Sequence, residues 1–121
     1  MYPPIFSTVS SLSAVTSLLG STPTRLYPFG EAPQDVAKPY AVWQIISGSP
    51  ENLLGDAPDI DSYSVQVDVY ADTGVEVRNV AQALRNAIQP VAHITAWRGE
   101  SKEIETGLYR YSFDCDWWVQ R

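Results

Sequence analysis

The chain carries apolar residues at helical spacing in two stretches. The first stripe, which Gly20 ends, consists of Ile5, Val9, Leu12, Val15 and Leu19. The second follows a capping-box pattern of Thr73 and Glu76 and stops before Pro90. Its apolar positions are Val77, Val80, Ala81, Leu84 and Ile88. These patterns predict one helix over 5–19 and another over 73–88.

Four further segments have the patterns of β-strands. Residues 63–70 alternate strictly between apolar and polar side chains up to Val69, which predicts a strand buried on one face. Residues 40–47 are apolar enough for burial on much of both faces. Residues 93–98 and 108–120 predict a third and a fourth strand, joined by a polar hairpin.

Prolines and acidic residues mark two connections. The segment 21–39 contains Pro23, Pro28, Pro33 and Pro39. Neither a helix interior nor a central strand tolerates these residues, so 25–27 is at most a short edge strand. Residues 49–59 are expected to form an acidic connection rich in turns.

The order α-β-β-α-β-β predicts an α+β fold in a single domain, 1–121. Two helices would pack on one face of a mainly antiparallel four-stranded sheet. On the last strand, the core face is expected to hold Tyr109, Tyr111, Phe113, Cys115, Trp117 and Val119. The opposite sheet face would carry Asp68, Arg110, Asp114 and Asp116. Water or another subunit would have to cover that open face.

Composition restricts the function more than the fold. With 121 residues, 45% of them hydrophobic, the chain is long enough for one compact domain and too apolar for disorder. Its net charge of −6 argues against a nucleic-acid clamp but does not exclude a channel through which DNA slides without sticking. The apolar N-terminal run lacks a preceding basic region and the length of a span, so we expect no signal peptide and no membrane association.

No group of residues has the pattern of an active site. Cys115 and His93 are the only cysteine and histidine, which excludes an internal disulfide and a Cys/His zinc site within one chain. Asp114 and Asp116 would lie about 6.8 Å apart on one strand face, near the spacing of catalytic carboxylate pairs. Their polar neighbours favour the ionised form of both, which a general acid cannot use. We therefore expect no catalysis, no cofactor, no metal and no small-molecule ligand.

Two surface features can each be explained by contact with solvent or by contact with a protein partner. No charged side chain occurs from Met1 to Thr24, so the outer face of the first helix consists of serine and threonine. This face either lies in water or packs on a neighbouring subunit, because burying hydroxyls costs less than burying charges. Trp118 points away from Trp117 and is either a rim residue covered by a loop or an anchor in a subunit interface.

Several blocks of sequence resemble a known family. They are RLYPFGEAPQ (25–34), KPYAVWQ (38–44), ISGSP (46–50) with LGD (54–56), VQVDVYAD (65–72) and ETGLYR (105–110). In this order the chain is similar to the siphophage tail-completion proteins, also described as tail-to-head joining or tail-terminator proteins, over about residues 5 to 119. Because the likeness extends over nearly the whole chain, the resemblance concerns the complete fold.

The resemblance implies a structural subunit that assembles, typically as a hexameric ring, at the head-proximal end of a phage tail tube. There it would stop tube polymerisation and join the tail to the head or neck. The implied partners are copies of the same chain, the major tail tube protein and a head–tail connector or neck protein. DNA would pass through the ring without sequence-specific binding, and the ring, assembled in the host cytoplasm, would become part of the virion.

Under this hypothesis, the candidate residues of the subunit or partner interface are Ser10, Ser13, Tyr27, Pro28, Phe29, Gln34 and Trp118. The candidate residues of the DNA-channel lining are Asp68, Asp114 and Asp116. An alternative is an acidic adaptor that presents its carboxylate face to a basic protein partner. A third hypothesis, a small hydrolase, would use Asp114 and Asp116.

Overall fold

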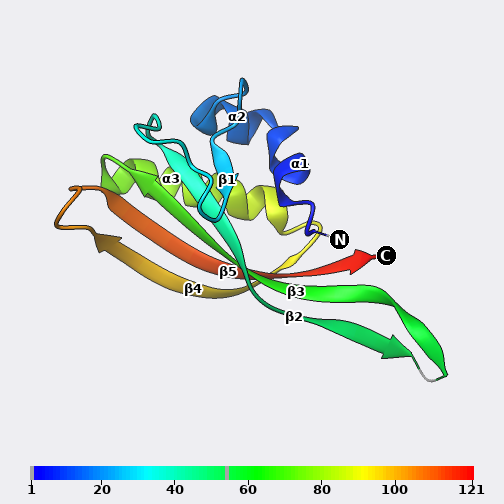
Figure 1. Cartoon of the computed structure of the whole chain (residues 1–121). Coiled ribbons are helices and arrows are strands. Elements are labelled where there is room, and N and C mark those ends of the chain that lie inside the picture. Colours follow the sequence, from blue (N-terminus) through cyan, green and yellow to red (C-terminus); the bar gives the residue numbers. More distant parts are fainter. Residues whose placement is uncertain (1, 54) are drawn as a thin grey trace.

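The computed structural model describes residues 2–53 and 55–121. Over these residues the helices are α1 (Ile5–Ser10), α2 (Ser13–Leu19) and α3 (Gly74–Ile88), and the strands are β1 (Leu26–Pro28), β2 (Tyr40–Leu53), β3 (Asp56–Ala71), β4 (His93–Lys102) and β5 (Tyr109–Gln120). The sheet order is β1-β2-β3-β5-β4, with β1 parallel to β2 and the other neighbours antiparallel. Figure 1 shows the helices on one face of this sheet.

The core lies between α3 and the central strands. Val65, Val67 and Val69 of β3 are fully buried, as the strict alternation predicts. Phe113, Cys115 and Trp117 of β5 are buried beside them, while Tyr109, Tyr111 and Val119 pack at the margin of the same cluster. From the helix side, this core is closed by Val77, Val80, Ala81, Leu84 and Ile88. Both predicted core faces are confirmed.

The α3 helix begins with the predicted cap. The Thr73 side chain accepts a hydrogen bond from the backbone N–H of Glu76 at 3.1 Å. Glu76 Oε1 in turn accepts from the backbone N–H of Asp72 at 3.4 Å, one residue before the usual position of a capping box. These bonds satisfy donors that a helix start leaves without partners, which fixes the direction of α3 against the sheet.

The predicted single helix over 5–19 is wrong. The chain interrupts it at Leu12, which has extended backbone angles (φ −106°, ψ 124°) and a side chain that is 42% exposed. Serine and threonine have low helix propensity, so tertiary packing decides the path of this segment. Each short helix buries its own apolar pair, Ile5 and Val9 in α1, and Val15 and Leu19 in α2.

The predicted four-stranded sheet has a fifth strand. Residues 26–28 pair in parallel with 41–43 of β2, which confirms the short edge strand and makes the sheet mixed. β4 is also longer than predicted and contains register irregularities between Ile94 and Ala96 and between Trp97 and Gly99. Because β1 is so short, most of the outer edge of β2 lies beyond its reach.

The acidic connection predicted over 49–59 is also wrong, because most of it is strand. Ser49 pairs with Ser62 and Glu51 with Ile60. Because β5 pairs with β3 only as far as Ile60, β2 and β3 continue beyond that point as a two-stranded ribbon past the rest of the sheet (Figure 1). We call residues 48–52 and 57–61 the arm. A ribbon leaves one edge of each strand free, which is where a strand tolerates a proline such as Pro50.

Candidate assembly surfaces

The outer surface of α1 and α2 is polar without being charged. Several of its hydroxyls donate to carbonyl oxygens of the same segment: Ser7 and Thr8 to Pro4 at 3.2 and 2.6 Å, Ser11 to Thr8 at 3.2 Å, and Ser17 to Ala14 at 3.4 Å. A hydroxyl bonded in this way can lose its contact with water without leaving a donor unsatisfied. A neighbouring protein can therefore cover this surface at small desolvation cost.

Large apolar side chains accompany these hydroxyls. Phe6 is 44% exposed, Phe29 is 69% exposed, and Tyr2 is 72% exposed. Tyr2, Pro28 and Phe29 line a groove together with Trp43, Gln44 and Ile45. The indole N–H of Trp43 is buried and has no acceptor among the described residues. Most of the side chains that line this groove are apolar or aromatic.

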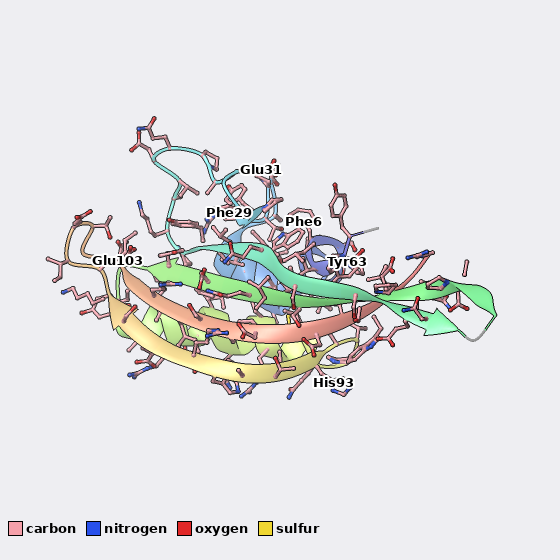
Figure 2. All side chains as sticks on the ribbon, turned by 60° about the horizontal axis from the view of Figure 1, so that its bottom comes forward. Phe6, Phe29, Glu31, Tyr63, His93 and Glu103 are labelled. Atoms are coloured by element: carbon pink, nitrogen blue, oxygen red, sulfur yellow. The ribbon has the colours of Figure 1, made fainter. Side chains whose placement is uncertain are left out.

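The predicted interface residues do not form one surface. Pro28 and Phe29 line the groove beside β1, and Gln34 lies exposed in the loop that projects from the sheet near Glu31 in Figure 2. Ser13 lines a second groove, between α2 and α3, with Leu12, Ala83 and Asn86. The remaining predicted residues are Tyr27 and Ser10, which are half-buried, and Trp118, which is exposed.

Trp118 lies on the open face of the sheet, opposite the helices. It is 49% exposed, whereas Trp117 is buried, so the predicted opposite directions of the two rings are confirmed. Its ring meets the edge of His93 at a centroid distance of 5.3 Å. His93 itself is exposed at the start of β4 (Figure 2). The pair gives this end of the open face an accessible aromatic surface.

Two of the three predicted carboxylates on the open face are buried, which the alternation of side chains along the strands does not predict. Asp68 is 9% exposed and Asp114 is 6% exposed. Arg110 Nη2 lies 3.0 Å from Asp68 Oδ1, and the Ser112 hydroxyl donates to the same oxygen. Arg98 contacts Asp114 Oδ2 through Nη2 at 2.7 Å. These carboxylates therefore hold neighbouring strands together.

Asp116 differs from the other two carboxylates. It is half-buried and accepts a hydrogen bond from the Ser64 hydroxyl at 2.7 Å, and no cation within the described residues forms an ion pair with it. Asp68 and Asp114, by contrast, are each balanced by a guanidinium. The open face is therefore weakly acidic, with Asp116 as the carboxylate whose charge is least compensated.

Arg98 is a residue that sequence reasoning missed. It occupies the irregular position between Trp97 and Gly99, where strict alternation along β4 breaks down and no longer predicts the direction of a side chain. The hydrogen bond to Asp114 raises the pKa of the Arg98 guanidinium. Because Arg98 engages Asp114 in an ion pair, Asp114 is not available as one of the two free carboxylates of the hydrolase hypothesis.

Cys115 lies on the helix side of β5 and is fully buried. Its sulfur accepts a hydrogen bond from Trp117 Nε1 at 3.2 Å. Burial raises the pKa of the Cys115 thiol to about 11, so the nucleophilic thiolate is scarce at neutral pH. The residue packs the core, as its position on the apolar strand face predicts.

Within residues 2–53 and 55–121 there is no cluster of three or more histidine, cysteine or acidic side chains that could hold a metal ion. None of the helices in the same ranges is long and apolar enough to cross a membrane.

Comparison with known proteins identifies the family. The family model described as Tail completion protein gp17 matches residues 3–120. Among solved structures, a chain in the virion of a native gene transfer agent particle superposes with a TM-score of 0.68 at 12% identity, covering 97% of this chain and 92% of that one. The gp17 protein of bacteriophage SPP1 gives a TM-score of 0.59 at 10% identity, covering 97% and 86%. No curated protein sequence matches.

The family match spans nearly the whole chain and agrees with the blocks between residues 25 and 110 that carry the resemblance. The structural matches share the fold at identities too low to transfer details of function. The chain therefore belongs to the Tail completion protein gp17 family, and it is a structural, non-enzymatic component of a virion tail.

Proposed function

We propose that this protein forms a closed ring, with six copies, at the head-proximal end of the tail tube. The ring ends tube polymerisation and joins the tail to the head or neck, and DNA passes through it. The observation that carries this proposal is the surface of α1 and α2, which lacks charge and whose hydroxyls bond within their own segments. Such a surface is suited to burial against another protein.

The proposed contacts follow from the position of the exposed apolar groups. Phe29 and the groove beside β1 lie next to the loop that carries Gln34, so this side can dock on the tube protein, the connector or a neighbouring copy. Ser10 and Ser13 belong to the uncharged helix surface, and Trp118 to the opposite face. A subunit with contact surfaces on several sides fits a ring between two further partners.

The proposed lining of the DNA passage is the open sheet face. Asp68 and Asp114 are neutralised by arginines, and Asp116 keeps the face weakly acidic. A lining without unpaired cations gives phosphates no site where binding would release counterions, so DNA slides without adhering. The adaptor hypothesis has less support, because two of its three carboxylates are already engaged inside the protein.

The oligomeric state of the purified protein tests the proposal. Native mass spectrometry and electron microscopy should show closed rings, alone or with tube protein, and tubes assembled with the protein should have limited length. Ser13→Arg should weaken assembly because it places a charge on the uncharged helix surface. Gln89→Arg, an exposed change at the end of α3, is the matched control. A strict monomer that leaves tube length unregulated would contradict the proposal.

The channel lining requires a separate test. Asp68→Lys is unsuitable, because it would place a second cation beside Arg110 in a buried position. Asp116→Lys adds a positive charge at the half-buried carboxylate, and we expect particles that assemble but deliver their genome poorly. Asp116→Asn, which keeps the acceptor for Ser64, is the control. Equal genome delivery by both variants would place Asp116 outside the passage.

A further inference from the structure

Charge is distributed unequally between the two edges of the sheet. The strands β2 and β3, on the β1 side, contain five acidic residues and no basic residue. At the other edge, α3 and β4 contain four basic residues and two acidic ones. Because Asp61 and Asp68 are paired with Arg121 and Arg110, the acidic character of this side is concentrated in exposed residues of the arm such as Glu51 and Asp59, whereas α3 and β4, at the opposite edge of the sheet order, carry a net positive charge.

Both edges also lack a complete neighbouring strand. Along β2, β1 pairs only with residues 41–43, and the positions that follow include Ile45 and Ile46, which are 41% and 42% exposed. Along β4, the only pairing among the described residues is with β5. Edges of this kind present backbone groups and side chains that another chain can cover.

The basic edge contains a groove between α3 and β4. It is lined by Arg78, Ala81, Gln82, Arg85, Trp97, Glu100 and Tyr111. The Trp97 ring forms its aromatic wall, 45% exposed and 5.7 Å from the ring of Tyr111. Arg78 is held by Glu100 at 2.6 Å, whereas Arg85 donates only to the Asn86 side chain at 3.1 Å. Arg85 thus has no carboxylate partner among the described residues.

We infer that neighbouring copies meet head to tail, with the arm of one copy docked on the α3–β4 groove of the next. The arm supplies the complementary chemistry, because Glu51 and Asp59 are exposed there and Ile46 lies at its base. Each contact then joins one patch of a copy to a different patch of the next copy, and contacts of this kind generate closed rings when the rotation between copies closes. The inference rests on the proposed ring and adds a second contact between subunits to the one proposed for the uncharged surface of α1 and α2.

A charge exchange between the two surfaces tests this contact. Asp59→Arg and Arg85→Glu each place like charges across it, and each should raise the protomer concentration needed for half-assembly by about tenfold or more. The double variant restores opposite charges in every contact and should recover rings. An equimolar mixture of the single variants should also recover even-numbered rings, because alternating copies pair opposite charges throughout. Glu105→Arg and Lys38→Glu, on exposed loops, are the matched controls.

Ring mass and the concentration dependence of assembly, measured at one low salt concentration, distinguish the outcomes. The contact is supported if the wild-type protein forms rings, each single variant weakens their assembly, and the mixture of the two variants recovers it. If both single variants form rings as readily as the control variants do, the proposed contact is wrong, whereas the proposed ring is unaffected. Weakening without recovery overturns it too, because the two residues then do not face each other. Absence of wild-type rings contradicts the proposed function itself.

Discussion

The strands β2 and β3 pass through two different environments. Inside the body of the molecule, Val65, Val67 and Val69 are fully buried between α3 and the sheet. In the arm, the same two strands pair with each other, β5 pairs with β3 only at Ile60 and Asp61, and most of the described side chains are exposed. The tip of the arm lacks both the neighbouring strand β5 and the covering helices, and this explains the difference in burial. The body therefore supplies stability, while the arm is free to make contacts with other proteins.

The largest effect on stability is expected from removing an aromatic side chain of the core. Phe113→Ala should lower the free energy of unfolding by about 3–5 kcal/mol, because Phe113 is fully buried in the body. Ile46→Ala, at the base of the arm, should change it by less than about 1 kcal/mol. Urea unfolding followed by circular dichroism measures both. Similar losses for the two variants would show that the arm also carries part of the folding energy.

A smaller effect is expected from the open face. Asp68→Asn removes the carboxylate charge that Arg110 and Ser112 share, and it should cost about 2 kcal/mol of unfolding free energy. Asp116→Asn keeps an acceptor for Ser64 and should cost less than about 0.5 kcal/mol. Thermal unfolding at fixed salt compares the two. Equal costs would mean that ionic pairing adds nothing to the strand contacts of the body.

The smallest effect is expected at the arm. The hydrogen bond from Arg121 holds the pKa of Asp61 below its usual range, so the pair stabilises the folded arm above about pH 4. That contribution is lost as the pH falls through the lowered pKa. In Arg121→Ala, the Asp61 titration followed by NMR should shift upward toward the usual carboxyl pKa. Arg78→Ala is the control, and an unchanged Asp61 midpoint in Arg121→Ala would rule out this pairing.

The fold was predictable where side-chain periodicity agrees with tertiary packing. The valines of β3 and the apolar stripe of α3 lie where their spacing predicts. The apolar spacing from Ile5 to Leu19 predicted one helix incorrectly, because serine and threonine make the helix too weak to stay continuous through Leu12. The arm was missed because Gly48, Pro50 and Pro58 normally signal turns, whereas an isolated ribbon tolerates them.

The candidate surfaces were predictable only in part. The lack of charge before Arg25 identifies the uncharged helix surface, and alternation along β5 correctly separates Trp117 from Trp118. The ion pairs of the open face required the register of three strands, which the sequence does not contain. The α3–β4 groove likewise depends on the distance between Arg85 and Trp97 in space, which no spacing along the chain specifies.

The pairing of β3 with β5 has a mechanical consequence. These strands share an uninterrupted antiparallel register of 12 residue pairs, from Ile60 with Gln120 to Ala71 with Tyr109. Tension applied along the strands loads these cross-strand bonds in shear, so they resist together rather than opening one after another. A subunit built on this ladder can transmit pulling force between neighbouring parts of a particle with little local deformation.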